Sequence, residues 1–419
     1  MILFLIWEIF SNFAEIKSQN MIEELSFKNI LSFKNETTLS FEATSDNSIE
    51  SSHVVEMPNG TRLLRLALIF GANASGKSNL IYALEELYGF WTLNPSNMDT
   101  QTGIEPFTLD TETPGQPSEF SLKIWIDGVR YWYQLRLTNK IVMLEKLSYY
   151  KTTQPIMVFE RKYEDGQSII KTNPAVQKID NETLKMLSLN CLPNMSVFAA
   201  RGRVNMKFNH VDGFRKWIHD GFMQTIYPET DMTKFARRML KENKDFKSYM
   251  LNFLNMADFN ITGLNEHPDD DGLRKLGFEH TVENERGREM YELNLGHQSN
   301  GTRRLLGIEA AVFDLCRNGS FLMIDEMDAS LHPDIMEYIL RQFLLEKSQS
   351  QLLITTHYDG LLRTINDLIR KDNIWFTEKD KSGASQLYSL VEFKGLSKIT
   401  HIDKAYRNGI FGALPQIKD

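Results

Sequence analysis

Gly71-Ala72-Asn73-Ala74-Ser75-Gly76-Lys77-Ser78 is the stretch that decides the fold of this chain of 419 residues. An apolar run at 64–70 precedes it, and an apolar-periodic stretch at 79–88 follows it. A glycine, four residues and Gly-Lys-Ser between a strand and a helix are typical of a phosphate-binding loop. The alternative is a glycine-rich turn with an incidental lysine, and the strand–loop–helix context argues against it.

The residue types in this loop point to nucleotide chemistry. Gly71 and Gly76 allow backbone torsions that a side chain would block. The N–H groups of the loop then surround nucleotide phosphates, and the helix N-terminus adds positive potential. Lys77 is predicted to reach the β and γ phosphates of ATP, and the Ser78 hydroxyl to bind Mg²⁺. The residues expected to contact the nucleotide are Gly71, Asn73, Gly76, Lys77, Ser78 and Asn79.

Composition sets broad limits on function. The formal net charge of −8 argues against a chain that coats nucleic acid, although a local basic patch is compatible with it. Cys191 and Cys316 have no neighbouring Cys or His at zinc spacing, which favours a reduced, cytoplasmic protein. Residues 1–20 contain an apolar run, 2–7, that is too short to span a bilayer. We interpret 1–20 as an extension or an upstream start; a partner-binding or membrane-touching helix is the alternative.

Two further strand ends carry polar residues. The apolar strand predicted at 321–324 ends in Asp325 and Glu326. Such an Asp beside a phosphate loop can hold Mg²⁺, and the following Glu can orient and deprotonate an attacking water. His357 ends another apolar strand, where ligands bind in open α/β sheets, and could donate to a γ-phosphate. Taken alone, solvated acids and a structural histidine are the commoner explanations.

A third motif precedes a predicted helix. Gln298-Ser299-Asn300-Gly301-Thr302 stands directly before the helix expected at 303–316. A hydroxyl, free N–H groups and the helix dipole together make an anion site. An ordinary Ser or Asn helix cap is the alternative interpretation.

The order and spacing of these motifs resemble the ABC-type ATPases of the SMC, RecF and DNA-break-repair group. Within that group the chain is most similar to the AbiL/RloA-type ATP-binding proteins of bacterial abortive-infection and phage-defence operons. These are related to the ATPases of OLD nucleases and of the PARIS system. The resemblance covers residues 21–419 in outline, and Asp-Glu-x-Asp-Ala-Ser-Leu-His-Pro at 325–333 is its most specific piece.

The resemblance implies roles by position. The phosphate loop matches the Walker A motif, Asp325 the Walker B aspartate that binds Mg²⁺, and Glu326 the catalytic glutamate, with Lys77 and His357 (the switch histidine) also catalytic. Residues 327–332 match the D-loop. The signature motif, which completes the ATP site of the opposite subunit, is matched by Ser299, Asn300, Gly301 and Thr302.

Some positions depart from the family pattern. Thr302 replaces the usual Gln, and His332 stands where many relatives outside this subgroup have Asp. Gln134 is a candidate for the Q-loop glutamine, and no adenine-stacking aromatic residue can be assigned.

The predicted fold is α/β: a P-loop NTPase of the ABC-ATPase type. It has a mixed sheet, an N-terminal antiparallel β subdomain and a helical insertion. Residues 21–158 form the first half of the core and 159–260 a mainly helical insertion. The second half of the core, with signature, Walker B, D-loop and switch His, is expected at 261–419. A hairpin is predicted at 120–137, turning at Asp127-Gly128.

The functional expectation is an ATPase that uses ATP and Mg²⁺ and forms a head-to-tail homodimer or higher oligomer. A defence switch acting on a separate effector, such as a Toprim-like or other nuclease, is the first interpretation. We expect no appended nuclease, because few residues follow His357. A DNA-repair ATPase acting on DNA and an ATP-assembled scaffold are the alternatives. Contact with nucleic acid, as against a solvated helix face, is open for Lys234, Arg237, Arg238, Lys241, Lys244 and Lys247, and for Arg201, Arg203 and Lys207.

Overall fold

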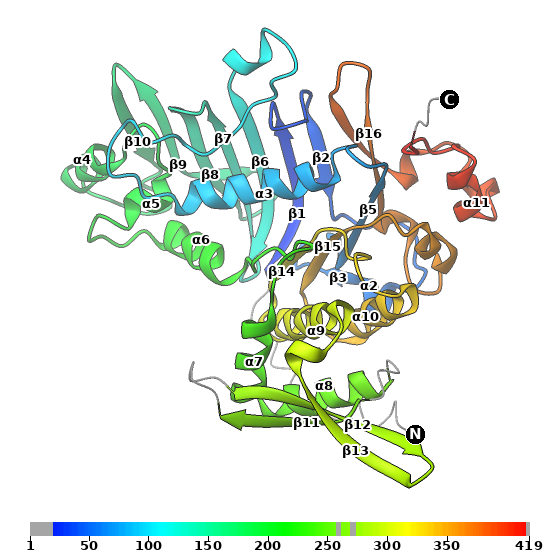
Figure 1. Cartoon of the computed structure of the whole chain (residues 1–419). Helices are drawn as coiled ribbons and strands as arrows, with labels where there is room; N and C mark the ends of the chain where they lie inside the picture. Colours follow the sequence, from blue (N-terminus) through cyan, green and yellow to red (C-terminus); the bar gives the residue numbers. More distant parts are fainter. Residues whose placement is uncertain (1–19, 257–260, 269–273, 416–419) are drawn as a thin grey trace.

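Two large sheets organise the molecule in the computed structural model, which describes residues 20–256, 261–268 and 274–415. One sheet is antiparallel throughout (Figure 1). Its strand order is β10 (Gln167–Thr172), β9 (Pro155–Glu164), β8 (Val142–Tyr150), β7 (Val129–Leu137), β6 (Ser118–Ile126), β1 (Met21–Lys28), β2 (Thr37–Ser40).

The second sheet is mixed, with four parallel strands and an antiparallel edge. Buried, nearly continuous apolar runs form its parallel strands, as expected for strands covered on both faces. The carboxyl ends of parallel strands meet at one edge, where ligands bind in such sheets. Its order is β14 (Phe321–Ile324), β15 (Gln351–Thr355), β5 (Leu66–Gly71), β16 (Ile374–Lys379), β17 (Ser385–Ser389).

β5 separates two hydrophobic cores because its side chains alternate between them. Ala67 and Ile69 belong to a core shared with α3 (Lys77–Thr92) and the antiparallel sheet. Leu68 and Phe70 belong to a second core with α9 (Asn300–Asn318) and α10 (Pro333–Leu345). Figure 1 shows α3 lying along the face of the antiparallel sheet. The strand that precedes the phosphate loop is therefore packed against a hydrophobic core on each face.

The helical stretch differs from the expected insertion at 159–260. β9 and β10 continue the antiparallel sheet past residue 158, so the helices begin only at Asn181. The sequence pattern at 234–253 predicts one long helix, but the structure has two helices there, because Asn243 has extended torsions. The helices are α4 (Asn181–Asn190), α5 (Val197–Arg201), α6 (Asn209–Asp220), α7 (Thr233–Glu242) and α8 (Lys244–Met256).

These helices are divided between the two cores. α5 and α6 pack on the antiparallel sheet, whereas α7 and α8 pack with α9. A three-stranded antiparallel sheet follows and precedes the signature region. Its strands are β11 (Ile261–Pro268), β12 (Arg274–Asn284) and β13 (Gly287–Asn294). The remaining elements are α2 (Glu50–His53), β3 (Val54–Glu56), β4 (Arg62–Leu64) and α11 (Ile402–Arg407).

The hairpin expected at 120–137 is present as β6 and β7. Asp127 and Gly128 have φ values of 49° and 76°, which is the pattern of a two-residue type I′ turn. Ile126 pairs with Val129 directly across this turn.

Some sequence-based expectations concern residues outside the described ranges. Residues 1–19, nearly all of the expected extension 1–20, lie outside them, as do residues 269–272 of the stretch 268–272, whose Pro-Asp-Asp-Asp-Gly sequence predicts a turn. Both cysteines are free thiols. Within the described ranges, no helix has the length and apolar character needed to cross a bilayer.

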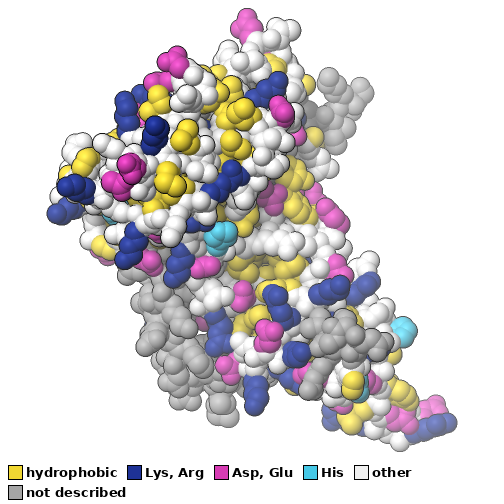
Figure 2. Space-filling view, turned by 90° about the vertical axis from the view of Figure 1, so that its left-hand side faces the viewer, with side chains coloured by type: hydrophobic (Ala, Val, Ile, Leu, Met, Phe, Trp, Pro, Cys, Tyr) yellow, Lys and Arg dark blue, Asp and Glu magenta, His cyan; other side chains and the backbone are white. Residues whose placement is uncertain are grey.

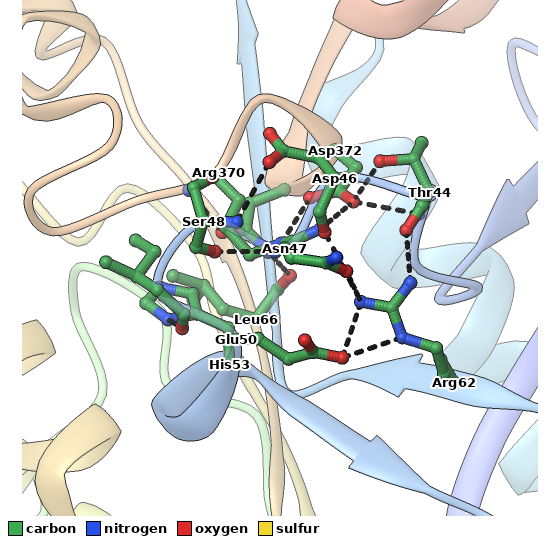
Figure 3. Close-up of polar contacts among 12 residues, drawn as sticks. Thr44, Asp46, Asn47, Ser48, Glu50, His53, Arg62, Leu66, Arg370 and Asp372 are labelled. Carbon is green, nitrogen blue, oxygen red and sulfur yellow. Dashed lines mark hydrogen bonds and ion pairs between the residues drawn. The ribbon is translucent and has the colours of Figure 1, made fainter.

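A buried arginine joins the N-terminal segment to the start of β16 (Figure 3). The Arg370 guanidinium is fully buried and donates to the carbonyls of Asp46 and Ser48. It also pairs with the Asp372 carboxylate at 2.6 Å, which in turn accepts from the backbone N–H and hydroxyl of Thr44. Nearly all N–H groups of the Arg370 guanidinium have a hydrogen-bond acceptor. This cluster therefore ties residues 44–48 to the strand beside the phosphate loop.

His53 lies next to this cluster and is 2% exposed (Figure 3). Its Nε2 lies 2.9 Å from the Leu368 carbonyl oxygen, and its Nδ1 lies 2.9 Å from the Ser52 hydroxyl. A neutral ring donates from Nε2 to the carbonyl and accepts at Nδ1. Burial lowers the pKa of His53 from 6.5 to about 4.

This depressed pKa predicts a pH dependence of stability. Between pH 6.5 and 4 the unfolded chain binds a proton at His53 and the folded chain does not, so stability falls as the pH drops through this window. At higher pH the contribution is constant. We expect the free energy of urea unfolding to fall between pH 7 and 4.5 by roughly 2 kcal/mol more in the wild type than in His53→Gln. Equal losses in the two proteins would contradict this.

Candidate active site

The phosphate loop leaves β5 and enters α3 through two glycines that the packing requires. A Cβ on Gly71 would lie 2.6 Å from the Ser75 hydroxyl and from the Thr377 carbonyl oxygen. Gly76 has φ of 114°, and a Cβ there would meet the Cβ of Ser385 at 2.8 Å. A hydrogen bond of 2.6 Å between the hydroxyls of Ser75 and Thr377 fixes the loop against β16. Strand packing therefore determines the shape of the loop.

Lys77 is the first residue of α3 and is 5% exposed. Its ammonium donates to the carbonyls of Gly71 at 2.9 Å and Ala72 at 3.1 Å. Burial lowers the pKa of Lys77, and the carboxylates of Glu326 and Asp325 act in the opposite direction. No side chain caps α3 at Gly76, so the N–H groups of its first turn have no side-chain acceptor there. The loop therefore presents a buried cation and helix donors to an anion.

The two acids after β14 are positioned by a threonine that the sequence analysis did not single out. Asp325 is 4% exposed, and its carboxylate accepts from the hydroxyl of Thr355 at the end of β15. The same hydroxyl accepts the backbone N–H of Glu326 at 2.8 Å. Glu326 itself has φ of 46°, in the left-handed region, which turns the chain sharply after the strand.

His357 stands beside Glu326, as the motif order predicts. Its Nε2 lies 3.7 Å from Oε1 of Glu326. Asp328 of the predicted D-loop accepts the backbone N–H of His357 at 3.1 Å and the hydroxyl of Thr356 at 2.7 Å. The predicted D-loop and the predicted switch histidine are thus linked within one chain.

A cavity of about 370 Å³ collects residues from these strand ends. It contains most of the loop residues predicted to bind nucleotide, together with Glu326 and His357. Gly71 and Asp325 are not in its lining. The Gly71 carbonyl accepts from Lys77, and Asp325 is bonded to Thr355, whose hydroxyl accepts the backbone N–H of Glu326. Lys379 at the end of β16 was not predicted. The lining is Asn73, Ala74, Gly76, Lys77, Ser78, Asn79, Glu326, His357 and Lys379.

The signature residues lie elsewhere, at the N-terminus of α9. Ser299 is the helix cap, and its hydroxyl accepts the backbone N–H of Thr302 at 3.0 Å. A Cβ on Gly301 would lie 2.8 Å from the Ser330 carbonyl oxygen in the D-loop. None of the residues 299–302 is among those that line the cavity of the described chain. Within one chain, Ser299 therefore acts as a helix cap.

Residues 66–363 match a protein family described as "AAA domain, putative AbiEii toxin, Type IV TA system". The chain belongs to this AAA-domain family. The matched range includes every predicted site residue from Gly71 to His357, whereas Lys379 lies beyond it. No curated protein sequence matches the chain.

The AAA domain has the arrangement of an ABC-type P-loop NTPase, and two solved structures of SMC heads are distantly similar. The SMC head domain from Thermotoga maritima is 15% identical, with a TM-score of 0.42, covering 88% of this chain and 98% of that one. The Smc head with an extended coiled coil from Pyrococcus furiosus, bound to the C-terminal domain of ScpA, is 14% identical, with a TM-score of 0.42. It covers 93% of this chain and all of the other. The likeness concerns the fold alone.

Arg304 connects α9 of the AAA domain to the turn after β14, and its role could not be predicted from the sequence. Its guanidinium donates to the carbonyls of Tyr227, Pro228 and Glu326, each at 2.9 Å. Burial lowers its pKa. Arg303, one residue earlier, is exposed and bonds to the side chain of Asn300. Nothing in the local sequence distinguishes these two arginines, because the acceptors of Arg304 are remote in the chain.

We expect Arg304→Ala to lower the kcat for ATP about 10- to 100-fold and to leave ATP affinity unchanged. Without the guanidinium, the backbone of Glu326 loses a fixed partner, and small misplacements of catalytic groups cost this much. Arg303→Ala is the matched control and should retain kcat. Steady-state kinetics and equilibrium binding would measure both. A loss of affinity at constant kcat, or equal effects of the two variants, would refute this role.

Gln134 is not at the site. It lies within β7, paired with Ser121 on β6 and Lys146 on β8, and does not line the cavity. The assignment of Gln134 to the Q-loop is therefore wrong, because the pairing of β7 with β6 and β8 places this residue in the middle of the antiparallel sheet.

Several of the candidate nucleic-acid contacts have structural partners, among them Lys247, which pairs with Glu266 at 2.8 Å. Arg201 pairs with Asp212 at 2.9 Å, and Arg203 donates to the side chain of Asn94 at 2.8 Å. On the face shown in Figure 2, basic and acidic side chains are interspersed. These contacts favour a structural role for Arg201 and Arg203 over contact with nucleic acid.

Proposed function

We propose that this AAA domain is an ATP-hydrolysing switch that dimerises head-to-tail around ATP. The observation that carries the proposal is the single cavity in which the phosphate loop, Glu326 and His357 meet. These groups come from three strand ends far apart in the sequence. A buried lysine, uncapped helix N–H groups and a nearby carboxylate are the set that phosphoryl transfer requires.

Each side chain has a distinct task in this proposal. Lys77 binds the phosphates and stabilises their developing charge. Ser78 and Asp325 would hold Mg²⁺, an ion that prefers oxygen ligands, and when bound it would neutralise phosphate charge. Glu326 orients and deprotonates the attacking water, and His357 donates to the γ-phosphate.

The dimer follows from the position of the signature motif. Ser299 and Gly301 do not line the cavity of their own chain, which supports the proposal that they contact the nucleotide bound by a second copy. Each γ-phosphate then joins Lys77 and His357 of one copy to Ser299 and Gly301 of the other. Hydrolysis removes the shared contact and loosens the pair, which is how a nucleotide switch operates.

The biological role proposed here is regulation in antiviral defence in the cytoplasm. The family description refers to an AbiEii toxin of a type IV toxin–antitoxin system. The motif resemblance to abortive-infection ATPases supports the same role. We propose that ATP binding and hydrolysis restrain or release a separate effector, a Toprim-like or other nuclease.

The activity is tested by phosphate release from ATP by the purified chain, with Mg²⁺ and with EDTA. We expect turnover that requires Mg²⁺. A chain that neither binds nor hydrolyses ATP would overturn the proposed function. Co-purification with the product of a neighbouring gene, with and without ATP, would test the effector.

A further inference from the structure

Lys379 places a second lysine at the cavity. It is the last residue of β16, whose Thr377 pairs with Gly71 on β5. Because the two strands are parallel, Lys379 lies past the point where the phosphate loop begins. Its side chain lines the same cavity as Lys77 and Glu326.

The β16–β17 hairpin is fixed to the phosphate loop at two points. Thr377 bonds to Ser75, with 2.6 Å between the two hydroxyl oxygens. Ser385, which pairs with Lys379 across the hairpin, packs so closely on Gly76 that no Cβ fits there. The backbone of Lys379 therefore has a fixed position relative to the loop, although its side chain is exposed.

The charge of Lys379 has no counterion among the residues that the structure describes. The neighbouring carboxylate of Asp380 is committed to its own turn, where it accepts the backbone N–H groups of Ser382 at 2.8 Å and Ala384 at 3.1 Å. By contrast, Lys34 pairs with Asp110 at 2.7 Å. Lys379 is thus a cation that faces the cavity and is available for an anion.

We propose that Lys379 binds the phosphate chain of the bound nucleotide as a second cation beside Lys77. The inference rests on the proposed function of the cavity. A nucleoside triphosphate brings several negative charges, and Glu326 adds another at the same place. Lys77 alone does not balance these charges, and a lysine ammonium is a flexible point charge suited to phosphate oxygens.

The test compares ATP binding by wild type, Lys379→Ala, Lys379→Arg and Lys381→Ala. Lys381 lies in the turn of the same hairpin, is exposed and does not line the cavity, so it is the matched control. We expect Lys379→Ala to weaken ATP binding about 10- to 100-fold, the usual effect of losing one charged contact. Lys379→Arg should largely restore affinity, and Lys381→Ala should match the wild type. Unchanged affinity in Lys379→Ala would overturn the inference.

Competition by inorganic tripolyphosphate identifies the part of the nucleotide involved. We expect its affinity to fall in Lys379→Ala by a factor similar to that for ATP. A loss confined to ATP would place Lys379 on the base or ribose and overturn the phosphate assignment. If the wild type binds neither probe, the proposed function fails first. Thermal unfolding without nucleotide should be the same in all variants, since Lys379 is exposed.

Discussion

Glu326→Gln is expected to reduce ATP turnover by at least about 100-fold while ATP still binds. The substitution is isosteric and keeps the backbone N–H that Thr355 accepts at 2.8 Å, so the turn after β14 should persist. It removes the carboxylate that would deprotonate water, and general-base catalysis typically contributes 10²- to 10⁴-fold. Phosphate release under saturating Mg-ATP measures the effect.

A second acid serves as the control for this variant. Glu36 is exposed and outside the cavity, so Glu36→Gln should turn over ATP like the wild type. Turnover by Glu326→Gln near the wild-type rate would remove Glu326 from the catalytic role. It would also favour a different base for the attacking water.

Lys77→Met is expected to lower ATP affinity by roughly 100-fold or more. Methionine fills a similar volume at this buried position but cannot donate to phosphate oxygens. The substitution leaves the carbonyls of Gly71 and Ala72 without the ammonium donor, a cost that is partly offset because burial disfavours the charged lysine. Calorimetric titration with Mg-ATP measures the affinity.

Thermal unfolding separates loss of binding from loss of folding in Lys77→Met. Mg-ATP should raise the Tm of the wild type and leave that of the variant unchanged. Lys381→Met, in the exposed hairpin turn, should respond like the wild type. A variant that unfolds without nucleotide far below the wild type, or that still gains stability from ATP, would contradict the role of Lys77.

The parts of the site that can be predicted from sequence are those encoded by consecutive residues. Gly76, Lys77 and Ser78 form one motif, and Asp325-Glu326 directly follows a short apolar strand. Their meeting at one sheet edge follows from parallel strands. The predicted α/β class and the hairpin at β6–β7 are found in the structure.

The residues that sequence reasoning missed depend on contacts between distant segments. Thr355 becomes informative only when β15 lies beside β14. Arg304 differs from Arg303 only because carbonyls some 20 or more residues away accept hydrogen bonds from its guanidinium. Lys379 reaches the cavity because β16 pairs with β5. The division of the helices between two cores was equally hidden, since the amphipathic pattern of α6 or α7 does not say which core the helix joins.

The most direct test of the shared ATP site is the molecular mass of the Glu326→Gln chain in solution. We predict 48.6 kDa without nucleotide and twice that value with Mg-ATP. Adding Ser299→Asp keeps a good helix cap but places a negative charge near the partner's γ-phosphate, so this double variant should bind ATP as a monomer. A Glu326→Gln chain that binds ATP and stays at 48.6 kDa would contradict the account.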